Sequence, residues 1–400
     1  LASLFGVSET AGGLPAAGGE AVGNAPSIEG LRIEWATRLP GRVTAMRLHD
    51  LNGDGRPEIV VGAGPTGGPN SVYALDADGS PQWEYAVGEQ LNDLECGDLD
   101  GDGRAEVVVA TGLLDRPGGI LALDAEGGLR WRYGVEASVL DVALGSVDGD
   151  LTLEVAAGEW GAFGDTIYLL EGEGHLRWKR PTRGSVHSVI IGDLDQEGGS
   201  EVLAGADDVY ALGVGGGLLW RYPTASYVSQ VALSLLDNAG ANQVVAATRY
   251  PDPSVSILDA KGMLVWRQEL DASPSVVVAE DVDKDGGHEV LVGALDGRVR
   301  LFGDDGAPRW ERQLAGPISD LELGDPGGDG ISDVVVGTGD YLSPGGVYVL
   351  DTLSGSLLAS YTGLEGATFV DVRDTDQNRG EEIVAASGSE VYLLRWAGGR

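Results

Sequence analysis

The feature that most constrains this chain is a nine-residue acidic segment, DLDGDGRAE, which runs from Asp98 to Glu106. Carboxylates occupy its positions 1, 3, 5 and 9, and glycine occupies position 6. Oxygen ligands at odd positions can converge on one hard cation, and the glycine permits the sharp turn that wraps the loop around it. A valine-rich strand, 106–110, follows at once. The segment therefore predicts a cation-binding loop joined to a buried strand.

The same unit of loop and strand recurs along the chain. Its period is roughly 41–49 residues, which is the spacing expected for the blades of a propeller. Seven full units and a shorter eighth cover residues 43–88, 91–136, 139–184, 186–226, 228–272, 276–316, 318–363 and 367–396. Function has to be argued from this repetition, because no catalytic motif accompanies it.

Each unit is predicted to contain four strands, which we call A to D. In unit one they are the apolar run 43–48, the segment 58–62 after the acidic loop, the segment 72–76, and the strand that contains Trp83. Strands C and D are joined by Asp78-Gly79, a strong hairpin signal between apolar runs. The D strands share a tryptophan that we expect to wedge between neighbouring blades: Trp83, Trp131, Trp178, Trp220, Trp266 and Trp310, with Ala359 in unit seven.

The two ends of the repeat array complement each other. Unit eight supplies strands A to C and then ends, whereas the early strand 31–35, with Trp35, has the pattern of strand D. We therefore predict an all-β, eight-bladed β-propeller with four-stranded antiparallel blades, closed by the N-terminal strand in the last blade, because closure removes open sheet edges. Seven blades and a separate hairpin are the alternative. Residues 31–400 form this one domain, and residues 1–30 form an arm rich in Gly, Ala and Pro.

Composition narrows the classes of partner. The chain has 63 acidic and 26 basic side chains, a net charge of −37, which disfavours nucleic acid because phosphate binding needs a basic face. No apolar run reaches the roughly 18 residues needed to cross a bilayer. The single cysteine, Cys96, allows no internal disulfide. The chain begins at Leu1 and not at a methionine, which indicates a processed or a trimmed N-terminus; a removed export signal would fit.

Two family resemblances meet in these units. The acidic loop followed by a Val-Val-Val strand resembles the FG-GAP repeat of integrin α-subunit propellers and their bacterial secreted relatives. The segment 122–131, ALDAEGGLRW, is similar to the repeat of pyrroloquinoline-quinone enzymes and their non-enzymatic eight-bladed relatives. Together the resemblances cover about residues 31–396, and they imply the propeller fold and several calcium ions.

The FG-GAP resemblance also implies a set of calcium ligands. In units one, two and six these are Asp50, Asn52, Asp54, the Arg56 carbonyl and Glu58; Asp98, Asp100, Asp102, the Arg104 carbonyl and Glu106; and Asp281, Asp283, Asp285, the Gly287 carbonyl and Glu289. Units eight and four offer Asp374, Asp376, Asn378 and Glu382, and Asp193, Asp195, Glu197 and Glu201. Units three, five and seven depart from the pattern at Ser146, Leu235 and Gly327, and we expect no ion in unit five. Calcium is preferred to magnesium because each intact loop is a nearly complete oxygen cage.

The acidic A–B loops and the B–C loops should lie on opposite faces of the ring. The B–C loops vary most in length, and the long ones carry aromatic residues, namely Trp160, Phe163, Tyr250 and Tyr341. Exposed aromatic side chains on a rigid scaffold often form a binding surface, so these four are the candidate ligand-binding residues. The alternative is that the loops only cap the blades.

These observations predict an exported calcium-binding propeller, extracellular or at the cell surface, that acts as a binding, adhesion or assembly module. Its partner is a protein or a glycan on the B–C face. The alternatives are a calcium-dependent polysaccharide lyase and a subunit of a surface filament that links copies through the N-terminal arm. No catalytic residue is assigned, because the histidines His49, His175, His187 and His288 lack a nucleophile motif.

Overall fold

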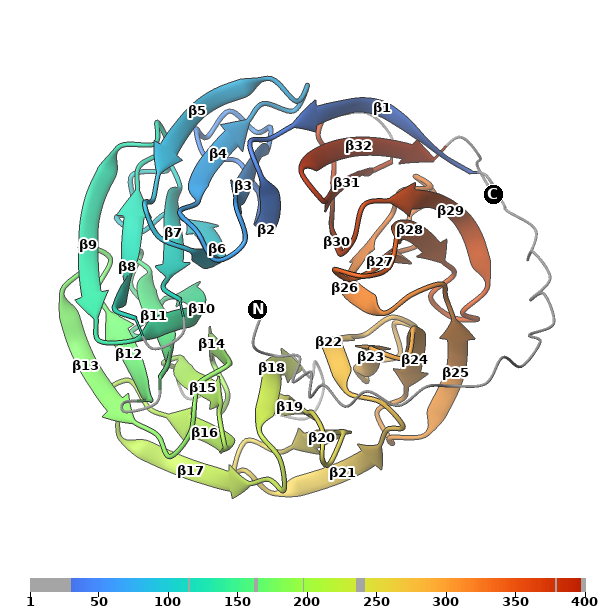
Figure 1. Ribbon diagram of the computed structural model, residues 1–400. Coiled ribbons are helices and arrows are strands. Elements are labelled where there is room, and N and C mark those ends of the chain that lie inside the picture. Colours follow the sequence, from blue (N-terminus) through green and yellow to red (C-terminus); the bar gives the residue numbers. More distant parts are fainter. Residues whose placement is uncertain are drawn as a thin grey trace, which may run out of the picture.

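The computed structural model describes residues 30–113, 116–161, 165–196, 198–234, 242–377 and 380–396. These residues form 32 strands in eight four-stranded sheets, which stand around a common axis (Figure 1). Every pairing within a sheet is antiparallel, as in β2–β3 (Arg42–His49 and Glu58–Gly64). The chain is therefore an all-β, eight-bladed propeller, as predicted, and its blades are numbered here as the units were.

The strands of the first four blades follow one another in sequence. Blade one contains β2, β3, β4 (Ser71–Leu75) and β5 (Pro81–Ala86), and blade two contains β6 (Leu91–Gly97), β7 (Glu106–Thr111), β8 (Gly118–Leu123) and β9 (Leu129–Val135). Blade three contains β10 (Ser138–Gly145), β11 (Glu154–Trp160), β12 (Thr166–Leu170) and β13 (Leu176–Pro181). Blade four contains β14 (Ser188–Gly192), β15 (Glu201–Gly205), β16 (Asp208–Leu212) and β17 (Leu218–Pro223).

Blades five to seven repeat this order. Blade five contains β18 (Val228–Ser234), β19 (Gln243–Thr248), β20 (Ser254–Leu258) and β21 (Leu264–Glu269). Blade six contains β22 (Pro274–Glu280), β23 (Glu289–Ala294), β24 (Arg298–Phe302) and β25 (Pro308–Gln313). Blade seven contains β26 (Ile318–Gly324), β27 (Asp333–Thr338), β28 (Gly345–Leu350) and β29 (Leu357–Leu364).

Blade eight is assembled from both ends of the chain. Its strand order is β1-β32-β31-β30, with β1 at Leu31–Arg38, β30 at Thr368–Arg373, β31 at Glu382–Ser387 and β32 at Glu390–Trp396. The register runs from Leu31 opposite Trp396 to Arg38 opposite Glu390. Figure 1 shows β1 on the outer side of β32. The predicted closure is confirmed, whereas residues 1–29 of the arm lie outside the described part of the chain.

The middle strands of each blade are buried on both faces, which explains their continuous runs of Val, Ile, Leu and Ala. In β7, Val107 and Val109 pack in the cluster shared with blade one, whereas Val108 and Ala110 pack in the cluster shared with blade three. Successive side chains of a strand point to opposite faces, so each sheet contributes to two interfaces. The core is thus eight apolar layers between neighbouring blades.

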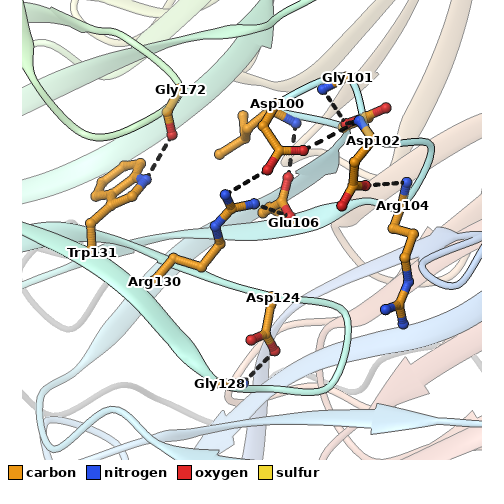
Figure 2. A network of polar contacts seen from close by, with 12 residues as sticks. Asp100, Gly101, Asp102, Arg104, Glu106, Asp124, Gly128, Arg130, Trp131 and Gly172 are labelled. Atoms are coloured by element: carbon orange, nitrogen blue, oxygen red, sulfur yellow. Dashed lines mark hydrogen bonds and ion pairs between the residues drawn. The ribbon is translucent and has the colours of Figure 1, made fainter.

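The repeated tryptophans tie each blade to the next one. The indole Nε1 of Trp131 donates to the carbonyl of Gly172 at 2.7 Å, in the C–D turn of blade three (Figure 2). Equivalent bonds of 2.8–3.2 Å start from Trp35, Trp83, Trp178, Trp220, Trp266 and Trp310. A glycine of each receiving turn, such as Gly174, leaves no room for a side chain beside the ring. The structural role expected for these residues is confirmed.

The interface between blades seven and eight differs because Ala359 replaces the tryptophan. Ala359 is fully buried and packs in one cluster with Trp396 of β32. A Cβ atom added at Gly30 would lie 2.8 Å from the Ala359 Cβ and 3.1 Å from Trp396 Nε1. Gly30 and Trp396 therefore fill this interface, and a larger residue at position 359 would displace them.

The innermost strands of neighbouring blades are linked by hydrogen bonds from backbone N–H groups to aspartates, which were not predicted from the sequence. Carboxylates on these strands accept backbone N–H groups of the next blade: Val189 N–H donates to Asp141 at 2.6 Å, and Leu48 N–H donates to Asp371 at 2.9 Å. Asp93 and Asp320 do the same for Val142 and Val370. The sequence signal for these links was an aspartate within the first strand of units two, three, seven and eight.

Candidate metal centres

The acidic loop of blade two is wound around its first carboxylate. Asp98 accepts the N–H groups of Gly101, Asp102 and Gly103 at 2.7, 3.1 and 2.8 Å. Gly101 and Gly103 have φ of +76° and +87°, in the left-handed region that glycine adopts without strain. The turn predicted at position 6 is therefore present.

In six of the loops the ninth residue, a glutamate, has a structural role that was not expected from the sequence. Its carboxylate turns back and accepts the N–H of the second loop residue, as Glu106 does for Leu99 at 2.9 Å. The same contact is made by Glu58, Glu154, Glu201, Glu289 and Glu382 at 2.8–3.2 Å. All six glutamates are buried. One oxygen of each glutamate thus closes the loop, and the other is available to a further partner.

Oxygen ligands converge in four of the loops. Ligand atoms lie within 4.8 Å of one another in the sets Asp98, Asp100 and Glu106; Asp193, Asp195 and Glu201; Asp281, Asp283 and Asp285; and Asp374, Asp376 and Glu382. In blade one, the Asn52 amide donates to Glu58 at 2.7 Å, so an amide takes the place of one carboxylate. These donors are hard oxygens in the arrangement that a calcium ion accepts.

The loop of blade six is the most poorly neutralised of these sets. Burial, together with the charges of Asp283, Asp285 and Asp281, raises the pKa of Glu289 to about 7. Nearby like charges disfavour the ionised form, and a divalent cation would reverse this effect. The residues of this loop therefore fit a calcium ion on the chemistry of the donor set.

In three blades an arginine occupies the open side of the acidic loop. Arg130 of β9 contacts Asp100 at 2.6 Å and Glu106 at 2.5 Å (Figure 2). In blade three, Arg177 contacts Asp148, Glu154 and Glu171, and in blade eight, Arg395 contacts Asp376, Glu382 and Glu34. In blades two, three and eight, part of the negative charge of the loop is thus balanced by an arginine of an adjacent strand.

The other loops lack that arrangement among the described residues. The position of Arg130 is taken by Gln82 in blade one and by Leu219 in blade four. In blade six it is taken by Arg309, which pairs with Asp304 and Asp305 and not with the acidic loop. Electrostatics therefore divides the candidate sites into two groups, those with an arginine and those without.

The remaining expected ligands are placed as follows. Asp54, Asp102 and Asp285 accept the N–H groups of Arg56, Arg104 and Gly287, whose carbonyls were the expected seventh-position ligands. Glu197 and Asn378 lie outside the described residues, as does the loop 235–241 of unit five. In unit three, Ser146 accepts the N–H of Gly149 at 3.0 Å and so takes over the loop-winding role of an aspartate.

The aromatic residues expected on the B–C face do not form one cluster. Tyr250 is 78% exposed in blade five, and Tyr341 is 42% exposed in blade seven, where the Arg42 guanidinium lies 4.2 Å from its ring centre. Trp160 ends β11 in blade three and is half-buried. Phe163 lies outside the described residues. These aromatic residues are therefore separate features around the rim.

A cavity of about 560 Å³ lies at the axis, where the innermost strands end at the acidic loops. The titratable residues of its lining are Arg47, His49, Glu95, Glu280, Glu322, Asp371, Arg373 and Glu381. The Glu322 side chain is exposed to solvent in the cavity. The neighbouring strands nevertheless desolvate its carboxylate, and this effect, together with the charges of Asp320 and Asp371, raises its pKa to about 8. The mouth of the axis on this face is thus strongly acidic.

Comparisons with known proteins identify both repeat types. A model of the FG-GAP-like repeat matches residues 50–109, and a model described as outer membrane protein assembly factor BamB matches residues 205–400. No curated protein matches the sequence significantly. None of the described residues forms a helix with the length and apolar character needed to span a membrane.

Solved structures confirm the architecture at low sequence identity. The V. cholerae biofilm matrix protein Bap1 is 15% identical with a TM-score of 0.70, over 92% of this chain and 91% of that one. BamB from Moraxella catarrhalis is 19% identical with a TM-score of 0.61, over 92% and 100%. Saccharomyces cerevisiae Sqt1 is 12% identical with a TM-score of 0.69, over 94% and 100%. This chain is an FG-GAP- and PQQ-like β-propeller protein.

Proposed function

We propose that this protein is a calcium-stabilised binding or assembly module that works outside the cell or at its surface. The observation that supports this best is that the two faces of the closed ring carry different kinds of loop. Acidic loops that can hold ions are gathered on one face, whereas long loops with exposed tyrosines rise from the other. A rigid ring that displays variable loops is a common design for recognition.

Among the loops that match the calcium pattern, those without an arginine are the best candidates for calcium. They are those of blades one, four and six, with side-chain ligands Asp50, Asn52, Asp54 and Glu58; Asp193, Asp195 and Glu201; and Asp281, Asp283, Asp285 and Glu289. A bound calcium ion supplies positive charge to carboxylates that otherwise repel one another. Affinities of such extracellular sites are of the order of 10⁻⁴–10⁻³ M, which is the basis for proposing an exported protein.

The B–C face is the proposed recognition surface, for a protein or a glycan. Tyr250 and Leu342 expose 78% and 96% of their surface there, on loops of blades five and seven. The similarity to a biofilm matrix protein and to BamB is compatible with a role in assembly. Self-assembly through residues 1–30 stays a prediction, because residues 1–29 lie outside the described part.

The axial cavity weighs against the lyase alternative. Its lining holds five carboxylates and only two arginines, Arg47 and Arg373. An acidic polysaccharide approaching this cavity would meet like charge, which is unfavourable at short range. We therefore favour binding over catalysis at the axis.

The proposal can be tested with surface material from the producing cells. Purified, fluorescently labelled protein should be retained by that material in calcium, and the double variant Tyr250→Ser with Leu342→Ser should lose retention at least tenfold. The matched control, Leu151→Ser, removes an 89% exposed residue of the acidic face and should be retained normally. Equal retention of all three proteins would contradict a role for the B–C face.

A further inference from the structure

One interface between blades contains a cavity on the B–C face. It lies between blades four and five and has a volume of about 410 Å³. Its lining includes Tyr222 and Thr224 from the end of blade four, and Thr248, Asp252, Ser256 and Arg267 from blade five. This volume is within the range of small-molecule sites, roughly 300–1,000 Å³.

The cavity coincides with a substitution that is specific to blade five. Ser256 pairs across the C–D hairpin with Arg267, the residue after the blade tryptophan. At the same register position the other blades carry large side chains, which are Tyr73, Leu121, Tyr168, Tyr210, Arg300, Tyr348 and Tyr392. The tyrosines there are buried, with 5–7% exposure. A serine leaves unfilled the space that a phenol ring occupies in five other blades.

Tyr222 consequently lacks the aromatic neighbour that its equivalent has elsewhere. In blades two and three, Tyr133 stands two residues after Trp131 and packs edge-to-face on Tyr168 of the next blade, with ring centres 6.0 Å apart. Tyr222 stands at the same distance after Trp220, but the residue opposite is Ser256. The Tyr222 side chain therefore borders the cavity, where it can pack against a ring-shaped ligand.

The polar lining offers donors and acceptors together. Asp252 and Arg267 are joined at 2.7 Å, and each is about one-third exposed. Thr224, Thr248, Ser254 and Ser256 also line the cavity. The hydroxyl groups of Thr224 and Thr248 already donate to backbone carbonyls, at 2.7 and 2.6 Å, so they offer their oxygens as acceptors. Arg267 also pairs with Glu269 at 3.0 Å, so two carboxylates share one guanidinium. Because the chain also has a net charge of −37, an anionic ligand is disfavoured. Closely spaced hydroxyls, a paired Asp and Arg, and an aromatic wall complement a neutral polyhydroxylated ring.

We propose that this cavity binds one unit of a neutral saccharide, whose pyranose ring takes the space of the missing tyrosine. Tyr222 packs against the ring, and Asp252 and Arg267 exchange hydrogen bonds with its hydroxyl groups. This inference rests on the glycan form of the proposed function and names its site and its class of ligand.

The sharpest test restores the residue of the other blades. Wild-type protein is titrated with maltose, cellobiose, lactose, mannobiose and chitobiose, and binding is measured by saturation-transfer NMR and calorimetry. Ser256→Tyr fills the cavity and should weaken binding of the recognised disaccharide at least tenfold without lowering the melting temperature. Arg267→Met should do the same. The matched control is Arg221→Met. Arg221 follows the tryptophan of blade four as Arg267 does in blade five, pairs with Asp208, and is not part of the cavity lining; the variant should bind normally.

Three results would overturn the proposal. They are no binding of any of these saccharides by the wild type, unchanged binding in Ser256→Tyr or Arg267→Met, or binding in the cavity of p-cresol alone. If Ser256→Tyr fails to fold, Arg267→Met compared with Arg221→Met still decides the question. Retention by surface material that depends on Tyr250 and Leu342 but is unaffected by Ser256→Tyr would leave the proposed function standing while rejecting this site.

Discussion

The guanidinium of Arg130 lies 2.5 Å from a carboxylate oxygen of Glu106, the last residue of the acidic loop in blade two. The loop with the most regular calcium signature is thus already partly neutralised by an arginine of a neighbouring strand. An ion that binds there has to displace the arginine, because both use the same carboxylate oxygens. A loop can therefore match the calcium-binding sequence pattern and still have part of its negative charge balanced by an arginine.

Removing Arg130 should strengthen calcium binding in blade two. In Arg130→Met the carboxylates of Asp100 and Glu106 lose their cation, so we expect calcium affinity at this loop to rise at least tenfold. Native mass spectrometry and calorimetry would show one additional or tighter ion per chain. The control is Arg132→Met, two residues along β9, whose guanidinium pairs with Glu89 and not with the loop. Identical calcium titrations for both variants would contradict the competition.

Chelation should lower thermal stability, and calcium should restore it. An ion that binds only the folded chain stabilises it by about 2.7 kcal/mol per site at a free concentration of 100 times Kd. The double variant Asp281→Asn with Asp283→Asn removes two ligands from the loop of blade six and should reduce this calcium-dependent rise in melting temperature. Differential scanning calorimetry with EDTA and with calcium measures both effects. A wild-type melt that does not respond to EDTA would refute functional metal sites.

Closure of the ring should depend on Trp35 and not on the residues before β1. Trp35 donates to the Ala77 carbonyl at 3.2 Å and packs in the cluster between blades eight and one. Trp35→Ala should destabilise the fold by about 3–5 kcal/mol, as large-to-small changes of a packed aromatic residue do. Urea unfolding at equilibrium measures the change. Deletion of residues 1–26 leaves β1 intact and is the control; a loss of stability as large as that of Trp35→Ala would contradict this account.

The repeat pattern predicted the architecture because each blade repeats the same local signals. Tryptophans such as Trp131 mark the outer strands, and the match of Trp35 to them showed where the ring closes. The acidic loops were equally visible, because their ligands lie close together in sequence. Features of this kind can be found by aligning a chain with itself.

Features that depend on exceptions to the repeat were missed. Arg130 reaches Glu106 across 24 residues of sequence, and the contact depends on which face of β9 the side chain occupies. The cavity beside Ser256 exists because one blade lacks a large side chain at a repeated position. Its signal was present in the sequence as a serine among tyrosines, but only the register of the strands shows that these positions correspond.

The axial cavity predicts a pH dependence of stability that one variant can isolate. Desolvation in the crowded axial cavity, followed by the charges of Asp320 and Asp371, raises the pKa of Glu322 to about 8 in the folded chain, whereas an unfolded glutamate titrates near 4.3. The folded chain therefore holds a proton that the unfolded chain releases between these values, so stability at this position is full below pH 4 and is lost as the pH rises through 8.

Glu322→Gln cannot ionise, so its melting temperature relative to the wild type should increase steadily from pH 5 to pH 8 and then level off. The control is Glu173→Gln in an exposed turn of blade three, whose melting temperature should follow that of the wild type at every pH. Thermal melts in a series of buffers at constant ionic strength measure the difference. A constant offset between Glu322→Gln and the wild type would show that the carboxylate is already ionised at pH 5, since a group that does not titrate in this window cannot change the slope of stability with pH.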